Sequence, residues 1–217
     1  MKRLGLLLFL LAIATLLAGS ALAQNVGDNS VYFTAYYSNA NIYGSPSTDV
    51  GKKPALALGV PDSTLRIIND GDAGTLWASI YAFDDSQELQ DCCSCPISAD
   101  GLLSESVNYQ LVNFDYVLTP VFNHTGVIKV ISSSVYAGGP NYTNTPAPGL
   151  HGWITHVQST KNEYPYGPAP YSQTETQWAD SNLSAVEKTG LENVCLYAGL
   201  LGSGFGHCSC TTEDYDF

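Results

Sequence analysis

Residues 75–97 read TLWASIYAFDDSQELQDCCSCPI, and this stretch decides the predicted fold. Residues 75–83 are rich in aromatic and β-branched side chains, which favour an extended strand. The polar sequence Asp-Asp-Ser-Gln follows as a turn, and residues 88–97 return as a second strand. The spacing of Asp85 and Glu88 also fits the start of a short helix. Because β-type sequence flanks the turn on both sides, we favour a hairpin.

Short β-type runs separated by turn residues continue on both sides of this hairpin. They predict further strands at residues 31–37, 55–58, 64–68, 104–118, 126–135 and 151–158. The Asn-Asp-Gly sequence at 69–71 predicts a hairpin that joins 64–68 to 75–83. Apolar side chains on both faces of 126–135 indicate a strand that is covered on both sides. The whole pattern predicts an antiparallel β-sandwich, Ig-like or jelly-roll-like.

The pattern changes near the C-terminus, where apolar residues recur at helical spacing. They are Leu183, Val186, Leu191, Val194, Cys195 and Ala198. We expect one α-helix over residues 183–200, with Ser181 or Asn182 as its N-cap. This helix should pack on one face or edge of the sandwich.

Six cysteines fall in two triplets: Cys92, Cys93 and Cys95, and Cys195, Cys208 and Cys210. An even number of cysteines in an exported chain predicts a disulfide framework. In extended chain Cys93 and Cys95 share one face and Cys92 points to the other. The simplest solution pairs the first triplet with the second and fastens the C-terminal helix and tail to residues 88–97. A thiolate zinc site that includes His207, and free thiols, remain alternatives, although structural zinc sites use longer spacers.

The N-terminus has the features of a signal peptide. Lys2 and Arg3 are basic, residues 4–17 are apolar, and Ala21-Leu22-Ala23 offers the small residues that a signal peptidase accepts. The apolar run is short for a membrane span. We therefore predict cleavage after Ala23, which leaves residues 24–217 as one secreted β-rich domain with no integral membrane segment. Its Cys-containing acidic tail would cover residues 207–217.

Cleavage also makes the chain more acidic. It removes Lys2 and Arg3, so that six basic residues face 20 acidic ones and the net charge falls from −12 to −14. A surface of this charge repels nucleic acid and anionic lipid, and nucleic acid is therefore excluded as a partner.

Acidic side chains in the turns are the main candidates for site chemistry. Oxygen-rich loops bind calcium, and paired carboxyl groups hydrolyse glycosides. The weak calcium candidates are Asp70, Asp72, Asp84, Asp85 and Glu88. The spacing of these acids is not diagnostic of a calcium loop or of a catalytic pair. The simplest interpretation is that they are solvated side chains in turns. We therefore assign no catalytic residue, and calcium is the one cofactor considered. His151 and His156 are interpreted as ordinary strand residues that face opposite sides.

Aromatic residues near the C-terminal half offer a second kind of site. A sugar-binding platform would use Trp153, Trp178, Tyr164, Tyr166 and Tyr171. We expect that most of these aromatic side chains instead fill the core or cover the loops.

Two segments resemble exported bacterial proteins of unassigned function. They are FDDSQELQDCCSC at residues 83–95 and GFGHCSC at residues 204–210. The resemblance implies bacterial export, and it brings no activity, ligand or catalytic residue.

We expect a secreted non-enzymatic β-sandwich that serves as a structural, surface-matrix or adhesion component and self-associates. Its partner would be a second copy, a surface glycan or a surface protein. The alternatives are a calcium- or carbohydrate-binding extracellular module and, more remotely, a secreted hydrolase that uses carboxylates. Residues 24–37 would pair in their own sheet, in preference to adding to the sheet edge of a neighbour.

Overall fold

The computed structural model describes residues 30–38, 63–111, 125–138, 142–159, 171–201, 208 and 210. Several predicted features lie outside these residues. They are the signal peptide, the weak strand at 55–58, His207, Tyr164 and Tyr166, and the acidic end of the tail.

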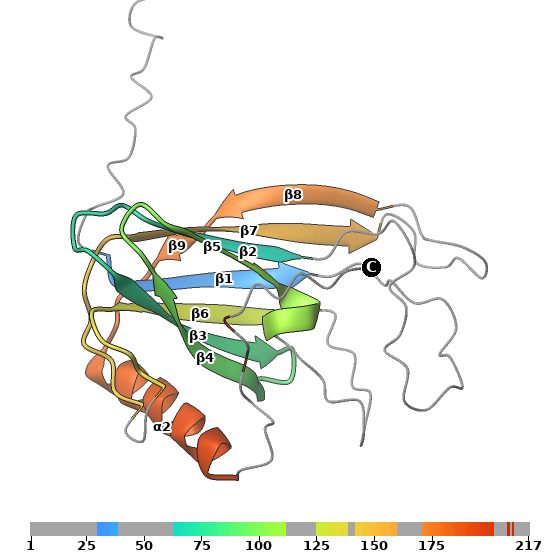
Figure 1. The fold of residues 1–217 in the computed structure, drawn as a ribbon. Helices are drawn as coiled ribbons and strands as arrows, with labels where there is room; N and C mark the ends of the chain where they lie inside the picture. The colour runs from blue at the N-terminus through green and yellow to red at the C-terminus, as the bar shows by residue number, and fades with distance from the viewer. Residues whose placement is uncertain are drawn as a thin grey trace, which may run out of the picture.

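The described strands form two antiparallel sheets that pack face to face, with a helix against the outer face of one sheet (Figure 1). The first sheet has the order β4 (Leu89–Ile97), β3 (Leu76–Asp84), β6 (Thr125–Ser133), β1 (Tyr32–Ser38) and β9 (Ala179–Asp180). The second has the order β5 (Leu102–Ser106), β2 (Thr64–Asn69), β7 (Leu150–Ser159) and β8 (Tyr171–Gln177). The helix is α2 (Ala185–Leu201). The prediction of a mainly-β sandwich with one C-terminal helix is confirmed.

Alternating apolar side chains from both sheets fill the main core. Buried members include Phe33, Ile80 and Ile128 from the first sheet and Leu65, Ile67 and Ile154 from the second. In β1 the side chains of Phe33 and Tyr37 are buried here, as the alternation predicts. β1 pairs with β6 along its whole length, so this segment does lie in its own sheet.

A second, smaller core lies between the first sheet and α2. Its buried members are Tyr32, Tyr81, Cys92, Ile131, Leu191 and Cys195. β6 lies between β3 and β1, with Ile128 in the main core and Ile131 in the second core. This confirms a strand that is covered on both faces.

The cap and the buried face of α2 differ from the prediction. Ser184 is the N-cap, because its hydroxyl accepts a hydrogen bond from the Glu187 amide at 3.1 Å. Leu191 and Cys195 are buried, but Val186 is 84% exposed and Val194 is 36% exposed. The apolar pattern runs around the helix, and it does not itself indicate which side meets the sheet. Among the described residues, no helix is long and apolar enough to cross a membrane.

The hairpin of β3 and β4 is confirmed, and it closes on Asp84. The Asp84 carboxylate accepts hydrogen bonds from the Glu88 amide at 2.8 Å and from Gln90 Nε2 at 2.7 Å. The strands pair from Leu76 opposite Ile97 to Phe83 opposite Leu89. The capping-box spacing of Asp85 and Glu88 therefore does not start a helix.

The predicted hairpin of β2 and β3 is wrong, because β2 belongs to the second sheet and β3 to the first. The backbone amides of the Asn-Asp-Gly turn donate hydrogen bonds to two distant loops. The amide of Asn69 donates to Gly101 O at 3.0 Å, and that of Asp70 donates to Gly149 O at 2.9 Å. The chain therefore crosses from one layer to the other, and Leu65 of β2 and Ile80 of β3 reach the same core from different sheets.

The buried side chain of Asn69 holds this crossing together. Its Nδ2 donates to Gly74 O at 2.7 Å and to Ile97 O at 2.9 Å, and its Oδ1 accepts from the Gly71 amide at 3.0 Å. Gly71 has φ of 90°, which disfavours any residue with a Cβ.

Asn69→Ala should therefore lower the free energy of unfolding by about 2–4 kcal/mol, because buried polar groups lose their partners. Chemical denaturation measures this change. Asp72→Ala is the control, since Asp72 is exposed in the same turn. Equal stabilities of the two variants would contradict this role of Asn69.

Two further parts of the chain differ from the prediction. β8 and β9 were not predicted, because the described side chains of β8 are polar and exposed and β9 has only two residues. Residues 104–118 were predicted to supply one or two strands. β5 covers Leu102–Ser106 and is followed by a π-helical turn, Val107–Leu111, which buries both Val107 and Leu111 in the core. Residues 112–118 lie outside the described residues.

Candidate functional site

All six cysteines are joined in disulfides between the two triplets. The pairs are Cys92–Cys195, Cys93–Cys208 and Cys95–Cys210. Because β4 is extended, Cys92 points to α2 while Cys95 points into the main core. The predicted attachment of the helix and tail to β4 is confirmed.

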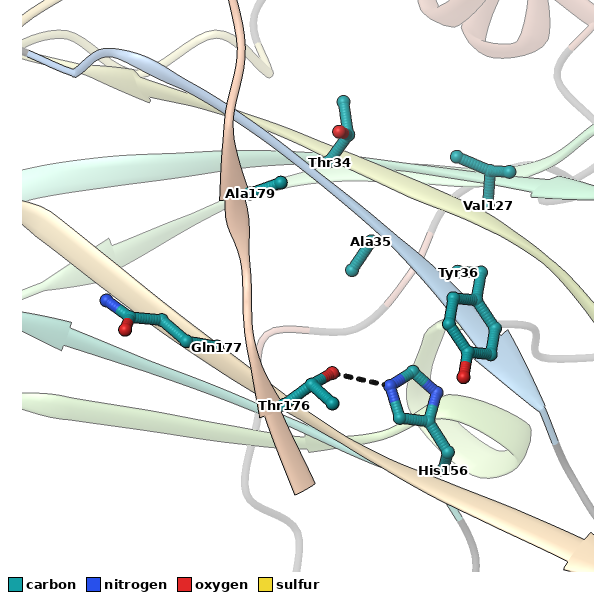
Figure 2. Close-up of a pocket in the computed structure, with 8 residues that line it drawn as sticks. All are labelled: Thr34, Ala35, Tyr36, Val127, His156, Thr176, Gln177 and Ala179. Carbon is teal, nitrogen blue, oxygen red and sulfur yellow. Dashed lines mark hydrogen bonds between the residues drawn. The ribbon is translucent and has the colours of Figure 1, made fainter. Parts of the chain in front are cut away.

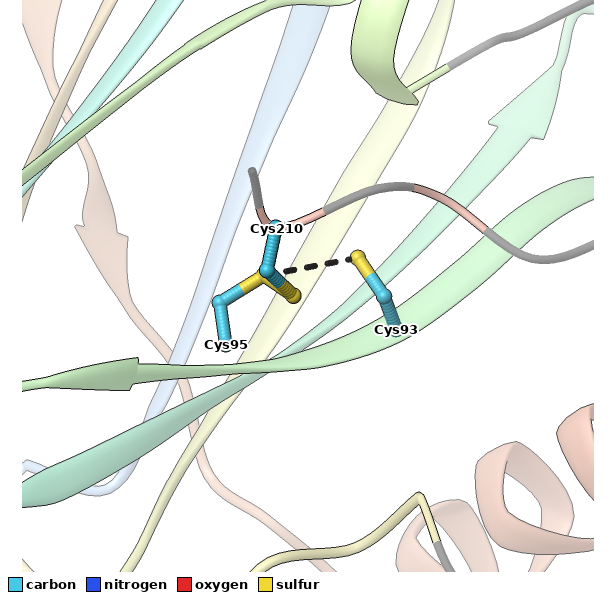
Figure 3. Close-up of side chains that lie close together, drawn as sticks. All are labelled: Cys93, Cys95 and Cys210. Atoms are coloured by element: carbon cyan, nitrogen blue, oxygen red, sulfur yellow. Dashed lines mark hydrogen bonds between the residues drawn. A yellow bond between two sulfur atoms is a disulfide. The ribbon is translucent and has the colours of Figure 1, made fainter. Parts of the chain in front are cut away.

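Two of these disulfides lie in contact with each other. The sulfurs of Cys93 and Cys95 are 3.7 Å apart, and Cys210 joins the same cluster (Figure 3). Within the described part of the chain, this is the one group of three or more His, Cys, Asp or Glu ligand atoms that lie within 4.8 Å of one another. All three sulfurs are disulfide-bonded, so they offer no thiolate to zinc.

The acidic candidates are separated into two turns at opposite ends of β3. Asp70 and Asp72 precede the strand, Asp84 is its last residue, and Asp85 and Glu88 follow it. Nine residues of strand span about 27 Å, which is too far for one shared site.

Hydrogen bonds within the turns engage two of these acids. Asp70 Oδ1 accepts from the Asp72 amide at 3.2 Å, and Asp70 Oδ2 lies 3.6 Å from His151 Nε2. Asp84 closes the β3–β4 turn as described above. The structure therefore gives Asp70 and Asp84 structural roles, and calcium binding stays an untested prediction.

One pocket lies where residues of β1, β6, β7, β8 and β9 come together. β8 belongs to the second sheet and β9 to the first, so the chain changes sheet at Trp178. The Trp178 side chain is buried in the core and packs so closely on Gly152 that a Cβ there would lie 3.1 Å from the indole. The pocket lies beside this crossing, between β1 and β8, and is called the groove below.

The groove has a volume of about 460 Å³. Its lining residues come from β1, β6, β7, β8 and β9, and they are Thr34, Ala35, Tyr36, Val127, His156, Thr176, Gln177 and Ala179 (Figure 2). Beyond Thr34, no strand among the described residues pairs with this edge of β1.

His156 lies at the base of the groove, fully buried between Thr176 and Tyr36 (Figure 2). Its Nε2 is 2.6 Å from Thr176 Oγ1, and its ring stacks on Tyr36 with centroids 4.0 Å apart. Nδ1 is buried and has no hydrogen-bond partner among the described residues. Burial lowers the pKa of His156, which favours the neutral imidazole.

Sequence reasoning did not find this pair. His156 was placed on the face opposite His151, but its contact with Tyr36 joins strands 120 positions apart and has no local signal. Of the aromatics that were considered for a sugar platform, Trp178 is in the core and Trp153 is half-buried on β7, while Tyr164 and Tyr166 lie outside the described residues.

A second residue that the sequence did not reveal is Glu105 on β5. It is fully buried opposite Leu65, and neither carboxylate oxygen has a hydrogen-bond partner among the described residues. Burial raises the pKa of Glu105 to about 7.

The comparisons with known proteins give little. No protein-family model matches the chain, and no curated protein matches it. One similar solved structure is the crystal structure of Thermotoga maritima 1070, with 16% identity and a TM-score of 0.40 over 73% of this chain and 100% of that one. This likeness is too distant to carry an inference.

Proposed function

We propose that the mature chain works outside the cytoplasm as a non-enzymatic structural, surface-matrix or adhesion module. The disulfide framework carries this proposal. Three disulfides join β4 to the C-terminal segment across sequence separations of 103, 115 and 115 residues. Disulfides of this kind persist in oxidising compartments, which agrees with the predicted signal peptide at residues 1–23.

The arrangement of the disulfides suits a module that must persist without repair. Links that close long loops destabilise the unfolded chain and so favour the folded state. The links also hold α2 and the tail segment against β4. The resemblance to exported bacterial proteins supports the same compartment.

The proposed module also associates with a second copy of itself. The outward face of α2 supports this part of the proposal. Val186, Tyr197 and Leu200 are 84%, 66% and 71% exposed, on the side of the helix away from Leu191 and Cys195. Gly190 lies on that outward face, and a Cβ there would have nothing within 4 Å. Two helices can therefore approach closely along this face. Sedimentation velocity at increasing concentrations measures the association.

Expression of the full chain in an exporting bacterium tests the compartment. We expect the exported protein to begin at Gln24, by N-terminal sequencing, and to contain no thiol that reacts before reduction. Ala23→Arg is the control, because a signal peptidase requires a small residue at this position, and it should accumulate as the uncleaved precursor. A cytoplasmic protein that keeps Met1 and six reactive thiols would contradict the proposal.

A further inference from the structure

The groove between β1 and β8 is not explained by a structural role. Its volume of about 460 Å³ lies within the range of small-molecule sites. Beside it, the Trp178 amide donates to Gly152 O at 2.9 Å and the indole packs on Gly152, at the point where the chain changes sheet.

The walls of the groove are uncharged, although the chain has a net charge of −12. They carry hydroxyl, amide and apolar groups, together with the His156 imidazole. A charged ligand would lose its hydration here without gaining an opposite charge. The chemistry therefore selects a neutral ligand.

The buried imidazole of His156 indicates which polar group the ligand should carry. Nε2 of His156 is paired with Thr176, whereas Nδ1 has no partner among the described residues. Nδ1 donates or accepts according to the tautomer, and a hydroxyl group can satisfy either state. The Tyr36 ring, which is 51% exposed, stacks on the face of His156, whereas a hydroxyl meets Nδ1 in the plane of the imidazole, so the stacked ring can stay in place.

Tyr36 also supplies an apolar surface at the mouth of the groove. One face of its ring lies on His156, and about half of the residue remains exposed. Thr34, Thr176 and Gln177 add hydroxyl and amide groups around it. A flat aromatic surface beside such groups matches a sugar ring, which has apolar C–H faces and hydroxyl edges.

We propose that this groove binds a neutral saccharide, with Tyr36 as the stacking surface and His156 as a hydroxyl partner. The inference does not depend on the proposed structural role, because binding is measured on the purified domain. A peptide strand added to the edge of β1 is the competing occupant.

Titration of the disulfide-bonded mature protein with neutral methyl glycosides, followed by protein NMR, tests the proposal. The probes are the methyl glycosides of glucose, galactose, mannose and N-acetylglucosamine. We expect saturable binding of at least one of them, with affinity reduced about tenfold or more in Tyr36→Ala and retained in Tyr36→Phe. Tyr136→Ala is the matched control, since Tyr136 is 54% exposed and packs on Trp77 at 4.8 Å; it should bind like the unchanged protein.

Three results would overturn the assignment. One is the absence of saturable binding to all four glycosides. Another is equal affinity of Tyr36→Ala and Tyr136→Ala. The third is binding of an uncharged acetylated hexapeptide, with shifts at β1, where no glycoside binds.

Discussion

Replacement of the Cys92–Cys195 pair by alanines is expected to lower the free energy of unfolding by about 3 kcal/mol and to detach α2. When the other disulfides are present, this link closes a ring of about 15 residues, for which the chain-entropy model gives about 3 kcal/mol. Both sulfurs also lie in the second core, beside Ile131 and Leu191. Chemical denaturation gives the free energy, and hydrogen exchange of the α2 amides reports the detachment.

Cys95→Ala with Cys210→Ala is the matched control. Because Cys93–Cys208 adjoins this pair, the Cys95–Cys210 link closes a ring of only a few residues, and its loss should cost about 2 kcal/mol. α2 should keep its hydrogen-exchange protection in this control. Unchanged protection of α2 in the Cys92–Cys195 variant would show that the helix is held by other contacts. The ion pair of Glu187 with Lys129 at 2.6 Å and the hydrogen bond from Tyr32 to Glu187 at 2.7 Å are such contacts.

Glu105→Gln is expected to stabilise the protein by about 3 kcal/mol at pH 8 and to have little effect at pH 4. The pKa of Glu105 is raised from 4.5 to about 7 in the folded protein. Between these values the folded state holds a proton that the unfolded state has released, so stability falls as pH rises. Above pH 7 the folded protein contains a buried carboxylate, and the amide of glutamine removes this charge.

Denaturation of both proteins from pH 4 to pH 8 measures the effect. The difference between the two curves isolates Glu105 from other groups, including His156, whose lowered pKa acts in the opposite direction. Glu88→Gln, which changes the same charge at an exposed position, is the control. Parallel curves for Glu105→Gln and the unchanged protein would contradict the burial of an ionisable Glu105.

Strands with alternating apolar residues could be predicted from the sequence, because burial on one face leaves a period of two. β1 and β2 follow this rule, whereas β6 was recognised by apolar side chains on both faces. These strands, together with β3, β4 and β7, were found within a few residues. The cysteine pairing between triplets was also predictable, because side-chain direction in an extended strand separates Cys92 from Cys93 and Cys95.

Features that depend on long-range contacts were not predictable. β8 is a polar edge strand that owes its extended form to pairing with β7. The turn after β2 carries a hairpin sequence, yet the hydrogen bonds of Asn69 and Asp70 to distant carbonyls direct it across the sandwich. The Tyr36–His156 contact joins β1 of the first sheet to β7 of the second, and no local sequence pattern marks it.

Disulfide mapping of the exported protein tests the central claim most directly. Trypsin leaves Cys92, Cys93 and Cys95 in one peptide, residues 67–129, and Cys195, Cys208 and Cys210 in another, residues 189–217. Stepwise reduction with labelling and fragmentation of the linked peptides then assigns each bond. We predict the bonds Cys92–Cys195, Cys93–Cys208 and Cys95–Cys210, with no cysteine reacting with an alkylating reagent before reduction. A bond within either triplet, or thiols that react without reductant, would contradict it.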